Sequence, residues 1–117
     1  MKTLTSTTDL GELLQQFFFE YLISQRRVSQ HTIASYRDSF LLLLSFVADF
    51  RKKSLPKLMM ADLDANIIIQ FLHYLEQDRN NSISTRNSRL AAIRCFFNFA
   101  ATQLPAGLPD IQKVLSI

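Results

Sequence analysis

The sequence predicts an all-α fold, a compact bundle of four helices with a short fifth helix at its C-terminal end. Two observations carry this prediction. Apolar residues recur at helical spacing along successive segments, and only two Gly and three Pro leave few sites for the sharp turns of a β fold. At 117 residues and 48% hydrophobic content, the chain suits one domain with a single core, without room for a separate catalytic lobe.

The first two helices are predicted from their caps and their apolar positions. The first helix should begin at Asp9, because Asp9-Leu10-Gly11-Glu12 has the spacing of a capping box. Its apolar positions are Leu10, Leu13, Leu14, Phe17, Phe18, Tyr21 and Leu22. Ser29 should cap the second helix, which is expected to extend from Gln30 to about Arg51.

The second helix has more apolar residues than one face can hold. Its main stripe consists of Ile33, Tyr36, Phe40, Leu44 and Val47. Leu42 and Phe46 fall on another side of the helix. They therefore need a second surface, which either the first helix or a partner would supply.

Two further helices and a short terminal one complete the prediction. The third should extend from about residue 64 to 78, and the fourth, capped by Ser84, from Thr85 to about Thr102. Their inward positions are Ile68, Phe71, Leu72 and Leu75 in the third helix and Leu90, Ile93 and Phe97 in the fourth. Beyond a break that contains Pro and Gly, residues 110–115 favour a last short helix.

Charge alternates along these segments, although the whole chain carries only +3. Residues 1–25 carry −2, residues 26–57 carry +5, residues 58–78 carry −4 and residues 79–104 carry +4. The second and fourth helices are therefore basic. If they are neighbours, one face of the domain becomes a cationic surface for phosphate groups. The alternative is that acidic and basic segments attract one another within the bundle.

Several classes of protein are disfavoured by composition. No run approaches the roughly 18 apolar residues of a membrane span, and residues 1–10 lack the apolar stretch of a secretory signal. The lone Cys95 excludes an internal disulfide and fits a cytoplasmic protein. His31 has no second ligand at metal-binding spacing. We expect no metal, cofactor or small-molecule substrate, and no glycine-rich phosphate loop or nucleophile–base pair supports an independent enzyme.

The two basic helices open with similar chemistry. Ser29-Gln30-His31-Thr32 and Ser84-Thr85-Arg86-Asn87 each offer free backbone N–H groups, hydroxyls and the positive end of a helix dipole, which suit a phosphate oxygen. Four positions of the fourth helix share one side: Thr85, Ser88, Arg89 and Ala92. Small side chains there would let the backbone approach a DNA groove, while Arg89 reaches a guanine edge or a phosphate.

Position also suggests roles for other side chains near these helix starts. Arg86 either turns outward to phosphate or pairs with an acid of the third helix. Arg94 lies on the opposite flank from Arg89, and phosphate binding and a structural salt bridge stay open for it. His31 is placed to touch a backbone phosphate. Tyr36 is expected in the core, with its hydroxyl near the rim.

Both helix openings resemble a known family. Ser29-x-x-Thr32-Ile33-x-x-Tyr36 followed by an apolar helix, and Ser84-Thr85-Arg86-Asn87-Ser88-Arg89-Leu90-Ala91-Ala92-Ile93-Arg94-x-Phe96-Phe97, resemble the SAM-like core-binding domain of tyrosine recombinases, the phage integrase family. The resemblance covers about residues 9–103. It implies that the second and fourth helices approach adjacent major grooves of a recombination half-site, and that neighbouring protomers on the DNA contact the first helix.

The resemblance also implies a contact set. Carried over by position, it comprises Ala34 and Ser35 on the second helix and Ser84, Thr85, Ser88 and Arg89 on the fourth. Together with the residues chosen from chemistry, the candidate DNA-binding residues are Ser29, His31, Thr32, Ala34, Ser35, Ser84, Thr85, Arg86, Ser88 and Arg89.

The family's catalytic residues have no counterpart in this sequence. The family uses an Arg, a Lys, a His-x-x-Arg, a further His or Trp and a nucleophilic Tyr, all in a separate domain. Neither His31-Thr32-Ile33-Ala34 nor His73-Tyr74-Leu75-Glu76 fits His-x-x-Arg. We therefore expect residues 1–104 to be a DNA-binding domain that is no enzyme by itself, and residues 105–117 to begin an interdomain linker. The alternative is a helical protein–protein interaction module without DNA binding.

Overall fold

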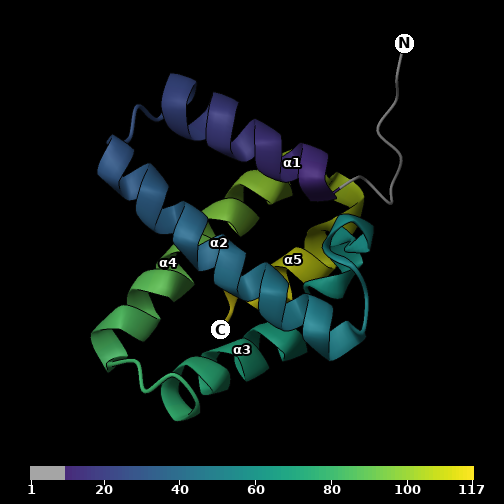
Figure 1. Ribbon diagram of the computed structural model, residues 1–117. Coiled ribbons are helices and arrows are strands. Elements are labelled where there is room, and N and C mark those ends of the chain that lie inside the picture. The colour runs from purple at the N-terminus through teal and green to yellow at the C-terminus, as the bar shows by residue number, and fades with distance from the viewer. Residues whose placement is uncertain (1–9) are drawn as a thin grey trace.

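The computed structural model describes residues 10–117, and helices account for most of this part of the chain (Figure 1). The prediction of an all-α bundle is confirmed. In chain order the elements are α1 (Leu10–Gln16), the π-helical segment η1 (Phe17–Gln25), α2 (Gln30–Arg51), the 3-10 turns η2 (Leu55–Lys57) and η3 (Met60–Asp62), α3 (Ala65–Gln77), α4 (Ile83–Gln103), the 3-10 turn η4 (Pro105–Gly107) and α5 (Leu108–Leu115). No helix within residues 10–117 is long and apolar enough to cross a membrane.

The first helix changes its winding at Phe17, which the sequence did not predict. Its buried positions are Leu10, Leu13, Phe17 and Leu22, so the spacing widens from three to four to five residues. A spacing of five matches the i to i+5 hydrogen bonds of a π-helix, and the Arg26 N–H donates to the Tyr21 carbonyl at 2.8 Å in this register. The predicted cap Asp9 lies outside the described residues.

The second helix confirms its predicted cap and bounds. Ser29 Oγ accepts a hydrogen bond from the Thr32 N–H at 3.1 Å, and α2 extends from Gln30 to Arg51. The expected second surface for Phe46 is α3, rather than the first helix or a partner. The Phe46 ring lies 5.6 Å from that of Phe71 and 5.0 Å from that of Tyr74. The apolar side chains of α2 therefore contact two other helices, α4 through Phe40 and α3 through Phe46.

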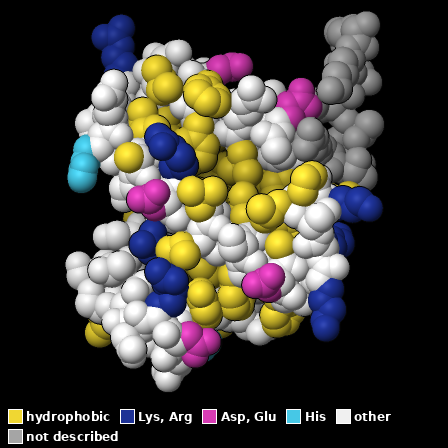
Figure 2. All heavy atoms as spheres, in the orientation of Figure 1, with side chains coloured by type: hydrophobic (Ala, Val, Ile, Leu, Met, Phe, Trp, Pro, Cys, Tyr) yellow, Lys and Arg dark blue, Asp and Glu magenta, His cyan; other side chains and the backbone are white. Residues whose placement is uncertain are grey.

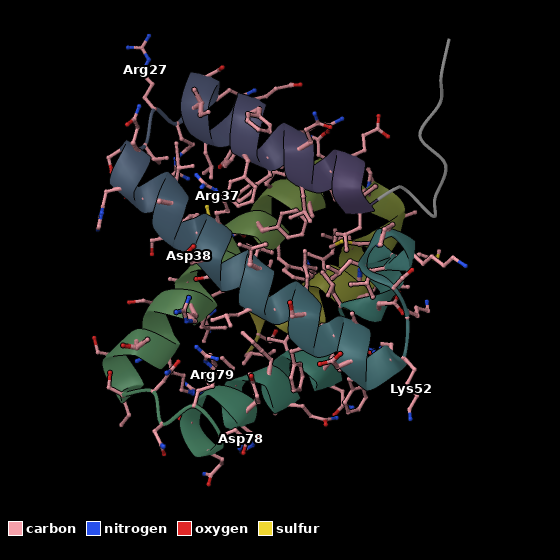
Figure 3. All side chains as sticks on the ribbon, viewed as in Figure 1. Arg27, Arg37, Asp38, Lys52, Asp78 and Arg79 are labelled. Carbon is pink, nitrogen blue, oxygen red and sulfur yellow. The ribbon has the colours of Figure 1, made fainter. Side chains whose placement is uncertain are left out.

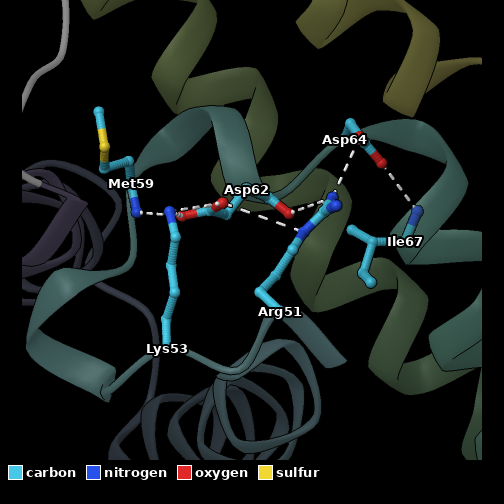
Figure 4. A network of polar contacts seen from close by, with 6 residues as sticks. All are labelled: Arg51, Lys53, Met59, Asp62, Asp64 and Ile67. Carbon is cyan, nitrogen blue, oxygen red and sulfur yellow. Dashed lines mark hydrogen bonds and ion pairs between the residues drawn. The ribbon is translucent and has the colours of Figure 1, made fainter. Parts of the chain in front are cut away.

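Residues 52–64 connect α2 to α3 through a network of ion pairs (Figure 4). Arg51 Nη2 donates to the Asp62 carbonyl and to Asp64 Oδ2, both at 3.1 Å, and Lys53 Nζ lies 2.9 Å from Asp62 Oδ2. The Met59 N–H donates to the same Asp62 oxygen at 2.8 Å. Burial disfavours the charged carboxylate, but the Met59 N–H and the two bases outweigh it and hold the pKa of Asp62 below its usual value.

The fourth helix begins earlier than predicted. Its cap is Ser82, whose Oγ accepts from the Thr85 N–H at 3.1 Å, so the assignment of the cap to Ser84 is wrong. Ser84 lies in the first turn. The reason is the preceding turn, in which Asn80 adopts φ 53° and the Asn81 N–H donates to the Leu75 carbonyl at 2.9 Å. This turn closes α3 early and leaves the next extended residue, Ser82, to start α4.

The C-terminal helix packs on the bundle. Ile111 and Val114 of α5 are buried, and α5 contacts both α3 and α4. Residues 105–117 therefore extend the core. The division of the protein into a domain at 1–104 and a linker from 105 stays a prediction.

α4 is the central helix of the bundle. Its residues Ile93, Phe96, Phe97 and Ala100 are buried, and it contacts η1, α2, α3 and α5. Figure 1 shows α2 crossing in front of α4, with α1 above the crossing and α3 below it. The starting ends of α2 and α4 lie on the same side of the molecule, on the left of the view.

Candidate nucleic-acid interface

A groove of about 350 Å³ lies between the first halves of α2 and α4. From the point where they cross, the two helices diverge toward their starting ends (Figure 1). The groove is lined by His31, Ala34, Ser35, Asp38 and Ser39 from α2 and by Ser84, Thr85, Ser88 and Arg89 from α4. Small residues and hydroxyls make up most of this lining, so an approaching ligand can come close to both helix backbones.

The structure brings together most of the residues that the sequence singled out. Seven of the ten candidates line the groove: His31, Ala34, Ser35, Ser84, Thr85, Ser88 and Arg89. Ser29, Thr32 and Arg86 do not line it. Because these seven residues come from two helices far apart in the chain, the groove is the feature that makes them one candidate site.

The two helix starts share one capping arrangement. Ser29 Oγ accepts from the Thr32 N–H at 3.1 Å and donates to Thr32 Oγ1 at 3.0 Å. Ser82 Oγ accepts from the Thr85 N–H and donates to Thr85 Oγ1, both at 3.1 Å. One of the free N–H groups expected at each start is therefore satisfied within the protein, and a phosphate would meet the remaining ones.

Arg89 is the central cation of the groove. Its Nη1 donates to Ser39 Oγ at 3.1 Å, across the crossing of α2 and α4. Its Nε is buried and makes no hydrogen bond within residues 10–117. No carboxylate in this part of the chain lies within ion-pairing distance of the Arg89 guanidinium. Ala92, expected beside Arg89 on the open side of α4, is instead fully buried, so it serves close packing inside the bundle.

Arg86 points away from the groove. Its Nε lies 2.8 Å from Glu76 Oε2 on α3, and its Nη1 donates to Asn87 Oδ1 at 2.9 Å. Of the two expected roles, the structure shows the pairing with an acid of the third helix. This pair ties the start of α4 to the end of α3.

The alternation of charge has two separate outcomes in space. At the far end of α2, Arg51 and Lys53 pair with Asp62 and Asp64, as the alternative of attraction within the bundle requires. At the starting ends, by contrast, several arginines stay exposed. Figure 2 shows Lys and Arg side chains on the side of the molecule where α2 and α4 begin, and apolar side chains between α1 and α2.

Three of these arginines are labelled in Figure 3. Arg27 extends away from the bundle just before α2, Arg37 lies on the exposed side of α2, and Arg79 lies near the turn that leads into α4. None of the three has a carboxylate partner within the described part of the chain. The starting ends therefore present arginines that are not held in ion pairs within residues 10–117.

Two residues of the groove were missed by the sequence prediction. Asp38 lines the groove and falls on the same side of α2 as His31 and Ala34, but it was not among the candidate DNA-binding residues. Ser39 is buried at 2% exposure, and it lies one helical turn after Ser35. A serine four residues after another on the groove side was the available signal for Ser39.

A second, wider groove of about 600 Å³ lies on the other flank of α4. Arg26, Tyr36, Arg94 and Cys95 line it together with Asn87, Leu90, Ala91 and Asn98. Tyr36, expected in the core with its hydroxyl near the rim, is half-buried, packs against the core and also forms part of this wall. Burial raises the pKa of both Tyr36 and Cys95, so the Cys95 thiol is not activated as a nucleophile. No acidic residue lines this groove, and Arg94 makes no salt bridge within residues 10–117.

No group of three or more His, Cys, Asp or Glu in residues 10–117 is arranged to hold a metal ion. The groove side chains are hydroxyls, one imidazole, one carboxylate and one guanidinium. Such a set binds polar and anionic groups.

The fold and the groove define a small helical bundle that presents two basic helix starts to a ligand. The chain belongs to the family described as phage integrase, N-terminal SAM-like domain, whose model matches residues 15–103. The match includes every candidate residue, and it confirms the resemblance of the two helix openings to this family.

Two curated relatives come from Sinorhizobium fredii. The protein named "Putative integrase/recombinase y4rC" is 41% identical over 114 residues, which cover 97% of this chain and 34% of that protein. The protein named "Putative integrase/recombinase y4rD" is 44% identical over 108 residues, which cover 92% of this chain and 38% of that protein. The chain thus spans about a third of the length of these relatives. No solved structure matches it.

Proposed function

We propose that this chain binds double-stranded DNA as the core-binding domain of a site-specific tyrosine recombinase, and that α2 and α4 grip a recombination half-site. The observation that carries the proposal is the groove between the starts of these helices, where Arg89 has no carboxylate partner within residues 10–117. A phosphate there meets hydroxyls, a guanidinium and the positive ends of two long helices.

The shape of the groove supports a duplex as the ligand. Its walls carry small residues such as Ala34, Ser35 and Ser88, which allow close approach of a sugar–phosphate backbone. Arg89 has the longest side chain in the groove, and it can reach a phosphate or the O6 and N7 atoms of a guanine. The exposed arginines around the groove add sequence-independent attraction to phosphates.

The rest of the recombination reaction is assigned to other parts of the protein. The relatives are named integrase/recombinase, and the matched region is about a third of each. We propose that strand cleavage takes place outside this domain, that the chain is not itself an enzyme, and that neighbouring recombinase protomers meet it on DNA. The lone Cys95 supports a cytoplasmic location.

The proposal is tested by fluorescence anisotropy of a labelled random-sequence duplex of about 20 base pairs, titrated with the chain from about 50 to about 200 mM salt. We expect binding that weakens steeply with salt. Arg89→Gln should weaken it and reduce the slope of log K against log salt by about 1. Lys52→Gln is the matched control, because it removes one charge at the opposite end of α2 (Figure 3).

Two results would contradict the proposal. One is unchanged affinity and salt slope in Arg89→Gln, which removes the groove from the interface. The other is salt-sensitive self-association of the chain without any anisotropy change of the duplex, which is the signature of a protein–protein interaction module.

A further inference from the structure

Ser39 is the only buried polar residue in residues 10–117. It lies on α2 at the crossing with α4, and its side chain makes two hydrogen bonds. The hydroxyl donates to the Ser35 carbonyl at 3.1 Å and accepts from Arg89 Nη1 at 3.1 Å. The two partners, Ser35 and Arg89, both line the groove. This buried hydroxyl is therefore satisfied, and both of its hydrogen bonds go to groove residues.

The chemistry of this hydroxyl fixes the direction of both bonds. A serine has one O–H donor and two acceptor lone pairs, whereas an arginine only donates. Because the Ser39 proton is directed to the carbonyl of Ser35, the lone pairs remain for Arg89. The two bonds are therefore compatible, and Ser39 links the backbone of α2 to the guanidinium of α4.

The partner of Arg89 differs in charge from the partners of Arg51 and Arg86. Arg51 and Arg86 are held by carboxylates at 3.1 and 2.8 Å, so their charges are compensated inside the protein. Ser39 holds Arg89 in place with a neutral group. The full positive charge of Arg89 therefore stays available to a ligand in the groove.

We propose that Ser39 is a positioning residue that orients Arg89 for DNA. This inference rests on the proposed function of the groove. An arginine side chain that is already held needs less ordering when a ligand binds. Avoiding the entropic cost of ordering one such side chain corresponds to about a twofold to tenfold gain in affinity.

The test is a double-mutant cycle of duplex affinity, measured with the same random-sequence duplex. Ser39→Ala should weaken binding about twofold to tenfold with the salt slope unchanged, since no charge is removed. In the Arg89→Gln background, Ser39→Ala should have no further effect. Ser39→Thr keeps a hydroxyl able to bond the i−4 carbonyl, and it should restore most of the affinity. Ser45→Ala is the matched control, because Ser45 is an exposed serine of the same helix.

A second measurement reports on Arg89 without DNA. The Nε–H signal of Arg89 in a ¹⁵N NMR relaxation experiment should show a more mobile side chain in Ser39→Ala than in the unaltered chain. Thermal unfolding of each variant identifies any general loss of structure.

The outcomes separate this inference from the proposed function. Binding that Arg89→Gln weakens but Ser39→Ala does not would overturn the positioning role alone. Equal losses from Ser39→Ala with and without Arg89 would also overturn it, because they indicate a merely structural serine. No duplex binding by the unaltered chain would overturn both proposals.

Discussion

Phe17 and Phe19 are neighbours in the sequence with opposite environments, and replacing each by alanine tests the packing of the π-helical segment. Phe17 is fully buried, with its ring centroid 5.3 Å from that of Phe96 and 5.6 Å from that of Phe99. Phe19, two residues later, is 63% exposed. The difference arises because η1 directs the ring of Phe17 into the core and the ring of Phe19 into solvent.

The magnitude follows from the buried area. A buried phenylalanine removes about 150 Å² or more from water, which at about 25 cal/mol per Å² gives about 4 kcal/mol. Core Phe→Ala substitutions cost about 3–5 kcal/mol. We therefore expect Phe17→Ala to lower the free energy of unfolding by about 3–5 kcal/mol and Tm by about 10–20 °C. Phe19→Ala should change the free energy by less than about 0.5 kcal/mol.

The assay is urea unfolding of the 117-residue chain followed by circular dichroism at constant temperature. The shift of the midpoint between Phe17→Ala and Phe19→Ala gives the difference in free energy of unfolding. Equal midpoints for the two variants would refute the orientation of η1 and with it the packing of the first helix on α4.

Three further substitutions test local interactions. Ser82→Ala should lower the free energy of unfolding by about 1 kcal/mol through loss of the α4 cap, whereas Ser84→Ala should change it by less than about 0.5 kcal/mol. Thermal unfolding of both variants tests this difference. A larger loss of stability in Ser84→Ala than in Ser82→Ala would restore Ser84 as the cap. Asp62→Asn should cost about 1 kcal/mol at neutral pH, because it removes a charge held between Lys53 and Arg51. Since the pKa of Asp62 is lowered on folding, its contribution is present above the unfolded-state value of about 4 and is lost as pH falls further. As pH is lowered from neutral to below about 4, the unfolding free energies of Asp62→Asn and of the unaltered chain should converge. A difference between them that persists at low pH would contradict the linkage.

The features that the sequence predicted are those with a local cause. Ser29 caps α2 as predicted, and Asp64, near which the third helix was expected to begin, caps α3. A side-chain cap depends only on the next three residues. The bounds of α2 and α3 follow from these caps. The placement of His31, Ala34, Ser35 and the α4 residues on one groove followed from a correct choice of helix sides.

The features that the sequence missed depend on contacts between distant residues. At the start of the π-helical segment, Phe17 packs against the rings of Phe40, Phe96 and Phe99, which lie far from it in the sequence. Ser82 and Ser84 are equally good caps by composition, and the turn at Asn80 decides between them. The hydrogen bond between Ser39 and Arg89 joins residues 50 positions apart.

The ion pairs at the far end of α2 have a consequence for how the domain meets a polyanion. Residues 49–64 hold four bases and three acids, whereas residues 26–39 and 79–94 together hold seven arginines and one aspartate. Arginines therefore outnumber carboxylates in the segments that form the starting halves of α2 and α4. If the chain binds DNA as proposed, this unequal distribution of charge turns the groove toward the phosphates before contact, which raises the fraction of collisions that are productive.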